Sequence, residues 1–275
     1  MANKILESLK QLNLNNQSQL NIAPCKALSK YVAKYTVTFF NDMITCDNIT
    51  LIPDASGCLI FTYDNLECSS LLWGPTTKTF NLHNDMNNYP LQLYIELLPG
   101  GLFFLTGCNQ IELTDMQIPL ELVNNRLNML VYHAFETADN LSNFIDKINS
   151  ILLQYFANDT IPQALSSSVE NILQHHGCLS VKEIAEKAFY SDRQINRLFK
   201  EYLGMNVKTL SSIVRINHIL QLMNSNKKQA ITTLAHTAGF YDQAHFVHTF
   251  KSVCGMTPKV YFNNMSDFYN DLIHF

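Results

Sequence analysis

Residues 239–258 read GFYDQAHFVHTFKSVCGMTP, and this stretch decides the fold of the C-terminal half. It has the pattern of one amphipathic helix that begins after a glycine turn and ends before Gly-x-x-Pro. Residues 189–206, FYSDRQINRLFKEYLGMN, are a weaker copy of it some fifty residues earlier. The repeat predicts two copies of one helical unit, and with them two copies of one function.

The match between the two copies extends to the helix before each of them. Ile184-Ala185-x-x-Ala188 returns fifty residues later as Leu234-Ala235-x-x-Ala238, and Phe199-Lys200-x-x-x-Gly204-Met205 returns fifty-one residues later as Phe250-Lys251-x-x-x-Gly255-Met256. Alanines at this spacing allow a second helix to cross close above the first, and the phenylalanine fixes that second helix in the core. The spacing therefore predicts two helix-turn-helix units.

The rest of the segment 164–265 also has the periodicity of helices. Ser180 and Glu183 form the sequence pattern of a capping box, so a helix is expected to begin there. Gly204, Gly255 and Pro258 are expected to end helices. The further expected helices are 164–176 and a long central helix at 207–223.

The N-terminal half has a different texture. Short β-branched or aromatic runs separated by Pro, Gly, Asn and Asp predict strands of an antiparallel sandwich or barrel. The runs lie at 34–40, 48–53, 57–64, 69–75, 78–83, 91–99 and 101–107.

Two helices are expected around these strands. A short one is expected near 6–14, and apolar residues at spacings of three and four predict an amphipathic helix at 139–157. This second helix either packs on its own barrel or pairs with a second subunit. The expected division is an N-terminal domain at 1–158, a linker at 159–163 and a C-terminal domain at 164–265.

The composition narrows the class of protein. The chain has 275 residues, of which 47% are apolar and 15% charged, so it can bury two cores. No apolar run reaches the roughly 18 residues of a membrane span, and the first residues lack the pattern of a signal peptide. The seven cysteines are scattered, which is typical of a reducing cytoplasm. We therefore expect a cytoplasmic protein without a membrane partner.

The charge is unevenly distributed. Residues 1–160 carry a net charge of −7 and residues 161–275 a net charge of +3, while 178–262 alone reach +6. An acidic first half joined to a locally basic second half is typical of a regulator with a separate nucleic-acid module.

The C-terminal repeat resembles a known family. The pattern Ala-x-x-x-Gly-Phe…His-Phe…Phe-Lys…Gly-x-x-Pro, preceded by its weaker copy, resembles the AraC/XylS family of bacterial transcription regulators over residues 165–262. The resemblance implies two recognition helices in successive major-groove segments of promoter DNA, joined by a central helix. It also implies activation by contact with RNA polymerase, with repression as the alternative.

The resemblance also implies which residues contact DNA. In the first recognition helix Arg and Asn side chains have the chemistry to read guanine and adenine. The base-reading candidates are Arg193, Asn196, Arg197, Gln243, Ala244 and His248. Lysines would contact phosphates without reading sequence. The phosphate candidates are Lys200, Lys208 and Lys251.

Two departures from the family pattern concern His248, where members often carry arginine, and Phe262, where the family usually ends Pro-x-x-Tyr-Arg. Each weakens the DNA contact expected from the second unit. Arg215 of the central helix matches a common family arginine, and a structural ion pair is its alternative role.

The segment 51–122 resembles the effector-sensing region of one branch of the same family. The runs LIPDASGCLIFTYD, LLWGPTTKTF, IELLPGGLFF and ELTDMQIPLEL carry this likeness. It implies a cupin-like barrel that senses a small molecule or forms a homodimer. The expected fold class is therefore α+β, with a β-rich cupin-like barrel followed by an all-α double helix-turn-helix.

Aromatic strand residues and two charged ones are the candidates for an effector pocket, because barrel interiors bind apolar ligands. The alternative for most of them is a role in the core. The candidates are Tyr63, Trp73, Phe80, Tyr94, Glu96, Phe103 and Arg126.

The sequence lacks the parts of an enzyme. A metal-binding cupin needs several convergent histidines, and residues 1–160 contain only His83 and His133. We therefore expect no enzymatic activity, no metal and no cofactor. Two alternatives stay open: a ligand-binding or catalytic barrel with a degenerate DNA-binding module, and a thiol-based redox sensor that uses Cys58 or Cys68.

Overall fold

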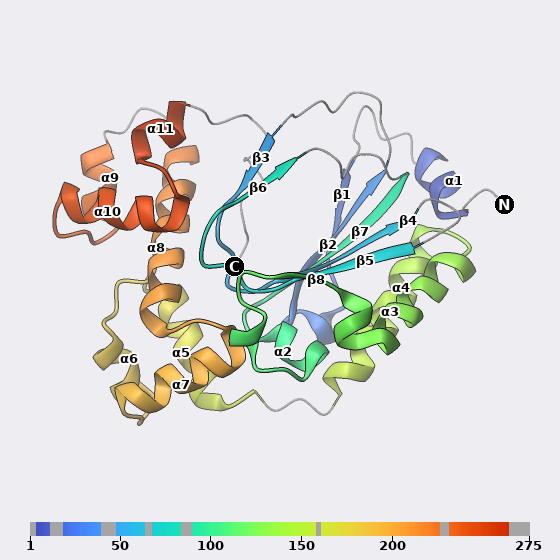
Figure 1. The fold of residues 1–275 in the computed structure, drawn as a ribbon, viewed down its shortest axis with the longest axis horizontal. Coiled ribbons are helices and arrows are strands. Elements are labelled where there is room, and N and C mark those ends of the chain that lie inside the picture. Colours follow the sequence, from blue (N-terminus) through green and yellow to red (C-terminus); the bar gives the residue numbers. More distant parts are fainter. Residues whose placement is uncertain are drawn as a thin grey trace.

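The structure is a computed structural model and describes residues 4–11, 19–39, 48–63, 68–83, 90–157, 161–225 and 231–263. Figure 1 shows a sheet between two groups of helices, with α3 and α4 on one side and α5 to α11 on the other. The predicted α+β class, with strands in the first half and helices in the second, is confirmed. No helix in these ranges is long and apolar enough to cross a membrane.

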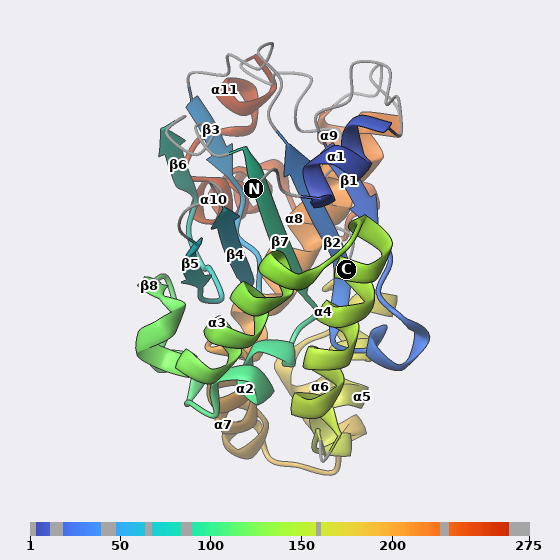
Figure 2. The ribbon, with the colours of Figure 1, turned by 90° about the vertical axis from the view of Figure 1, so that its right-hand side faces the viewer.

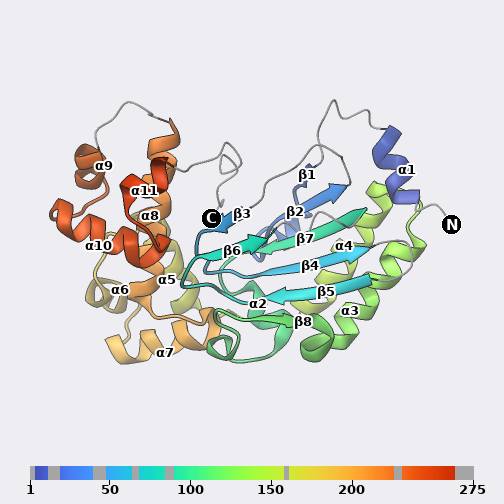
Figure 3. The same cartoon turned by 45° about the horizontal axis from the view of Figure 1, so that its top comes forward.

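Six strands form one antiparallel sheet in the order β1-β2-β7-β4-β5-β8. Figure 3 shows them side by side in one layer. Their bounds are β1 Gln19–Ile22, β2 Val32–Phe39, β4 Cys58–Tyr63, β5 Cys68–Trp73, β7 Leu91–Leu97 and β8 Gln117–Pro119. The strands β3 (Asn48–Leu51) and β6 (Phe80–His83) pair with each other in a second sheet. Within the described ranges no strand ladder joins the two sheets into a closed ring.

One face of the large sheet is apolar and lies under α3 (Leu120–Thr137) and α4 (Leu141–Phe156) (Figure 2). Leu59, Phe61 and Ile95 point to this face and are fully buried in the same cluster as Phe144 and Leu152 of α4. Apolar residues at every second position of the strands pack here against apolar residues spaced three and four apart along α4. The helix predicted at 139–157 therefore packs on its own sheet.

Several segments differ from the sequence prediction, which did not include the strands β1 and β8. Residues 101–107 were expected to be a strand but form α2 (Gly101–Thr106). Gly100 adopts a φ of 92° and turns the chain, and Leu102 and Leu105, three apart, are then buried together. The helix α3 was not predicted. Some of its apolar residues, such as Leu122 and Met129, are exposed, so the apolar positions in its sequence do not follow one face of a helix. The expected helix near 6–14 is α1 (Lys4–Gln11).

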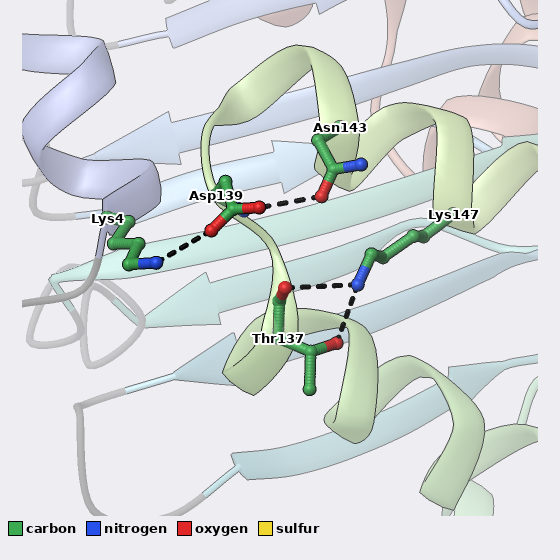
Figure 4. Close-up of polar contacts among 5 residues, drawn as sticks. All are labelled: Lys4, Thr137, Asp139, Asn143 and Lys147. Atoms are coloured by element: carbon green, nitrogen blue, oxygen red, sulfur yellow. Dashed lines mark hydrogen bonds and ion pairs between the residues drawn. The ribbon is translucent and has the colours of Figure 1, made fainter.

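Polar contacts hold the corner between α3 and α4 against α1 (Figure 4). Lys4 Nζ lies 2.6 Å from Asp139 Oδ1, and the backbone N–H of Asp139 donates to Asn143 Oδ1. Lys147 Nζ donates to the carbonyl oxygen and the hydroxyl of Thr137. The N-terminal helix is thus tied to a corner that lies more than 120 residues away in the sequence.

The C-terminal half consists of seven helices in the described residues. They are α5 Gln163–Gln174, α6 Val181–Lys187, α7 Asp192–Leu203, α8 Val207–Ser225, α9 Ile231–Thr237, α10 Gln243–Cys254 and α11 Pro258–Asn263. Each helix expected between 164 and 254 is confirmed to within a few residues. Residues 159 and 160 of the expected linker and the loop after α8 lie outside the described residues, and Gln163, expected in the linker, begins α5.

The loop 52–57 of the N-terminal half reaches into the C-terminal core. Ile52 and Ala55 are buried in the same apolar cluster as Phe199 and Phe250. Between them, Asp54 accepts a hydrogen bond from the backbone N–H of Ser56 at 2.9 Å. Burial raises the pKa of Asp54 to about 6, from an ordinary value of 3.8, although this hydrogen bond opposes the shift.

We expect Asp54 to make the folded protein less stable as the pH rises. Because the folded pKa is raised, the stability is full below about pH 4 and is lost as the pH rises through about 6. The variant Asp54→Asn keeps the oxygen that accepts from Ser56, and its free energy of unfolding should exceed that of the wild type above pH 6 by about 3 kcal/mol at most. Urea unfolding between pH 4 and 7 measures this difference.

The control is Asp139→Asn, whose difference in free energy of unfolding from the wild type should stay nearly constant from pH 4 to 7. Lys4 lowers the pKa of Asp139 below its ordinary value of 3.8, so the stability that this carboxylate contributes is present above that value and is lost only at lower pH. A constant difference between Asp54→Asn and wild type from pH 4 to 7 would contradict the assignment of a buried, pKa-shifted carboxyl group at position 54.

Candidate nucleic-acid interface

The first helix-turn-helix unit is formed by α6 and α7, and each helix begins with a capping box. The Ser180 hydroxyl accepts from the backbone N–H of Glu183, whose carboxylate accepts from the N–H of Ser180, as predicted. Ser191 and Gln194 make the same reciprocal contacts at the start of α7. The second box follows the same spacing rule, with glutamine in place of glutamate.

The helix α7 buries one side and leaves the other open. Ile195 and Phe199 are fully buried, and Ala185 of α6 is also buried where the two helices cross. Arg193 and Arg197 lie on the exposed side. The exposed side therefore presents two guanidinium groups, which have the geometry to bind guanine edges or phosphates.

Asn196 lies differently from the other base-reading candidates. Its Nδ2 donates to the carbonyl oxygen of Asp192 at 2.8 Å, and its Oδ1 accepts from the backbone N–H of Val207 at 3.1 Å. Both ends of the amide are thus used inside the protein, at the junction of α7 and α8. These two bonds fix the orientation of the amide, so we infer a positioning role for Asn196, and base reading by its remaining N–H stays a prediction.

The second unit is formed by α9 and α10 and repeats this plan. The Asp242 side chain caps α10 by accepting from the N–H of His245 at 2.7 Å. Phe246 and Phe250 are fully buried, as Ile195 and Phe199 are in the first unit. The exposed residues of α10 include the three base-reading candidates Gln243, Ala244 and His248, together with His245, which the sequence analysis did not select. We call α7 and α10 the reader helices.

The central helix α8 joins the two units and is held at its first half by close contacts. Gly177, before α6, approaches so closely that a Cβ there would lie 2.1 Å from the carbonyl oxygen of Ser211. Arg215 donates to the carbonyl oxygen of Gly177 at 2.5 Å and lies over the ring of Phe240, 5.1 Å from its centroid. Arg215 therefore links α8 to both units and has a structural role.

A stack of two imidazoles adds to the same junction. The rings of His176 and His218 lie parallel with centroids 3.7 Å apart. Burial, and next the neighbouring His176, lower the pKa of His218. The lowered pKa favours the uncharged form of the His218 ring in this stack.

The phosphate candidates Lys200, Lys208 and Lys251 are all exposed. Two exposed aromatic residues beside the reader helices were not selected from the sequence. Phe189 is 96% exposed and Tyr241 is 89% exposed, and both lie in the turns that precede the reader helices. Phe189 also adopts a φ of 58°, in the position where the second unit has Gly239. Exposed aromatic side chains at such turns are available to a partner.

Tyr94 and Glu96, two of the effector-pocket candidates, belong to a half-buried polar face of the sheet. On the face opposite α3 and α4, the register aligns Trp73, Cys58, Glu96 and Lys34 across four neighbouring strands. Glu96 accepts from the Thr36 hydroxyl at 2.7 Å and lies 3.6 Å from Lys34 Nζ. This row is a candidate floor for a ligand.

Trp73 and Phe80 extend this candidate site at one end. Their rings meet edge to face with centroids 5.6 Å apart. The buried Trp73 Nε1 has no hydrogen-bond partner among the described residues. A buried donor without an acceptor is available to a polar atom of a ligand.

The other three effector-pocket candidates lie elsewhere. Tyr63 stacks on Phe135 of α3 under the helical layer, and Arg126 is exposed on α3. Phe103 of α2 packs against Tyr202 of α7, with ring centroids 4.2 Å apart. The structure thus brings four of the seven candidates to one face and gives Phe103 a contact with a reader helix.

Two observations bear on the alternative chemistries. Burial, with the nearby carboxylates of Glu96 and Asp54, raises the pKa of Cys58 well above its usual value, which disfavours the thiolate of a redox sensor. Within the described part of the chain no group of three or more His, Cys, Asp or Glu residues is placed to hold a metal ion.

We expect Asn196→Ala to lower the free energy of unfolding by about 1–2 kcal/mol, because it leaves the partly buried N–H of Val207 without an acceptor. Arg193→Ala is the matched control on the exposed side of the same helix and should change the stability by less than about 0.5 kcal/mol. Chemical denaturation of the full chain measures both. Equal stability of Asn196→Ala and the control would contradict the positioning role.

Comparison with known proteins gives the following. A family model described as a helix-turn-helix domain matches residues 184–264. An uncharacterised HTH-type transcriptional regulator of Staphylococcus aureus (strain MRSA252) is 27% identical over 201 residues, which cover 72% of this chain and 23% of that protein. The melibiose operon regulatory protein of Escherichia coli (strain K12) is 29% identical over 101 residues, which cover 37% of this chain and 32% of that protein. The chain thus spans less than a third of the length of either relative.

Solved structures show partial likeness. The C-terminal domain of AraT, a response regulator from Geobacillus stearothermophilus, aligns with a TM-score of 0.36 and 24% identity over 42% of this chain and 98% of that one. ToxT from Vibrio cholerae aligns with a TM-score of 0.41 and 13% identity over 90% of this chain and 98% of that one.

The family match covers both helix-turn-helix units from Ile184 onward, including the two reader helices and the central helix between them. The C-terminal half of the chain therefore contains a helix-turn-helix domain.

Proposed function

We propose that the protein is a DNA-binding transcription regulator that reads promoter DNA with both reader helices. The observation that carries this proposal is the pair of helix-turn-helix units, each of which buries one side of its reader helix and exposes the other. In such units the second helix enters the major groove. Arg193 and Arg197 are the base-reading residues of the first reader, and Gln243, Ala244 and His248 face the groove in the second.

The length of α8 supports simultaneous binding by both readers. Its 19 residues span about 28 Å at 1.5 Å per residue. Successive major-groove segments on one face of DNA lie about 34 Å apart. The two reader helices lie beyond the ends of α8, so the distance between them exceeds the length of α8. They therefore fit major-groove segments about one turn apart.

The N-terminal half senses a small molecule in this proposal. The half-buried polar face would bind a compact neutral or cationic effector through Glu96, Lys34 and the Trp73 Nε1, which has no hydrogen-bond partner among the described residues. The exposed apolar side chains Leu122 and Met129, seven residues apart on α3, are available to a second copy of the chain. The regulator would act in the bacterial cytoplasm, as an activator that contacts RNA polymerase.

Selection of bound sequences from a random pool of DNA duplexes tests the proposal. The full chain should enrich a motif with two blocks about one helical turn apart. A single block would restrict base reading to one unit. A pool without enrichment, with the chain shown to be folded, would count against sequence-specific DNA binding.

We expect Arg197→Ala to weaken binding to the selected DNA by about 1–3 kcal/mol and to relax the preference at one base position, because a bidentate contact to guanine is lost. Lys251→Ala is the contrasting variant. It should weaken binding to all sequences alike and reduce the slope of log affinity against log salt by about one. Fluorescence anisotropy at several salt concentrations measures both, and an unchanged motif in Arg197→Ala would refute its base-reading role.

A further inference from the structure

The N-terminal half touches the carboxyl end of the first reader helix. The helix α7 ends at Gly204, whose carbonyl oxygen lies 2.8 Å from the hydroxyl oxygen of Thr114. Thr114 follows the short 3-10 helix η3 (Gln110–Glu112) of the N-terminal half. Its hydroxyl also lies 3.0 Å from the carbonyl oxygen of Gln110, so its single proton is shared between the two halves of the chain.

The fit at this contact requires glycine. Gly204 has a φ of 72°, and a Cβ there would lie 2.2 Å from Thr114 Oγ1 and 2.8 Å from the carbonyl oxygen of Gln110. A larger residue would therefore both strain the backbone and push η3 away. The backbone of the reader helix and that of η3 are packed as closely as glycine permits.

Apolar contacts flank this hydrogen bond. The ring of Tyr202 packs on Phe103 of α2, with centroids 4.2 Å apart. Leu203 is fully buried and comes within 3.7 Å of the position that a Cβ on Gly100 would take. The last turn of α7 is thus held on two sides by α2 and η3.

The platform that holds α7 is itself rigidly built. Gln110 is fully buried, and its Nε2 donates to the hydroxyl of Thr106 at 3.0 Å and to the carbonyl oxygen of Cys108 at 2.9 Å. These bonds tie η3 to the end of α2. A displacement of α2 would therefore carry Thr114 and the end of α7 with it.

The second reader helix also ends at a glycine that lies close to a threonine of the N-terminal half. Gly255 follows α10 with a φ of 70°, and a Cβ there would lie 2.7 Å from the hydroxyl oxygen of Thr79 in the N-terminal half. Each reader therefore has its carboxyl end against a threonine of the N-terminal half. The bases would be read elsewhere, since Arg197 lies seven residues, or about 10 Å along the helix, before Gly204.

We propose that this double contact is a clamp that sets the separation and tilt of the two reader helices. Phe103 and Thr114 of the N-terminal half are the residues of the clamp that position α7. The proposal rests on the proposed DNA-binding function and adds the route by which the N-terminal half controls it. The clamp leaves the arginine side of α7 open, so it orients the reader and does not block it. A change of the N-terminal half that moves α2 or η3 would then move α7 relative to α10.

Two substitutions at one position isolate the hydrogen bond of the clamp. Thr114→Val removes the hydroxyl at nearly constant volume, whereas Thr114→Ser keeps it. Phe103→Ala removes the aromatic contact, and Ser150→Ala, on the exposed side of α4, is a control far from the clamp. All are made in the full chain, and circular dichroism checks that each variant is folded.

The first measurement is hydrogen exchange of the backbone amides of residues 200–204, which needs no DNA. Thr114→Val combined with Phe103→Ala should speed this exchange about tenfold, while Thr114→Ser and Ser150→Ala behave as the wild type. Unchanged exchange in the folded double variant would overturn the clamp, whatever the protein does to DNA.

The second measurement compares affinity for DNAs in which the spacing between the two selected blocks is varied by a few base pairs. The wild type should lose at least about tenfold in affinity away from the best spacing, and the double variant should discriminate less than about threefold. An identical spacing preference in both, despite faster exchange, would overturn the control of the readers by the clamp. A wild type that binds no DNA would instead defeat the proposed function, and the exchange result would still decide whether the clamp exists.

Discussion

The C-terminal half depends on one constraint: each reader helix must bury one side completely while the other stays open to solvent. Phe199 and Phe250 meet it in the same way, since both are fully buried at the same place in their units. Burying a phenylalanine side chain stabilises a fold by about 2–3 kcal/mol, and small alanines at the crossing points let the partner helix come close. Arg215 and Gly177 then fix α8 between the two units, which determines where the exposed sides point.

The two faces of the large N-terminal sheet also differ in polarity and in exposure. One face is apolar and buried under α3 and α4, which gives this half its core. The other carries a half-buried row, in which Glu96 and Lys34 pair and the buried indole N–H of Trp73 has no hydrogen-bond partner within the described part of the chain. A buried donor is costly unless it is satisfied, so the Trp73 end of this row is suited to a ligand that completes the hydrogen bond. The loop that contains Asp54 and the segment α2–η3 connect this half to the readers.

The sequence predicted the helices of the C-terminal half because capping boxes, glycine ends and the period of apolar residues are local signals. Most strands were predicted for the same reason. It failed at 101–107, where the turn at Gly100 and the packing of Leu102 with Leu105 override the strand-like composition. Of the candidate site, the exposed Arg193 and Arg197 could be selected from spacing, but the internal bonds of Asn196 could not, since they involve Val207, eleven residues away. The contact of Thr114 with Gly204 spans ninety residues and has no local signal.

In the proposed function, the two reader helices bind one face of DNA about one turn apart. Hydroxyl-radical footprinting of the full chain on a selected DNA examines this arrangement, because the method maps contacts on each strand at single-nucleotide resolution. We expect two protected patches about ten base pairs apart on the same face of the duplex, with protection at both lost in high salt. One continuous patch no wider than a single reader, or two patches on opposite faces, would contradict it.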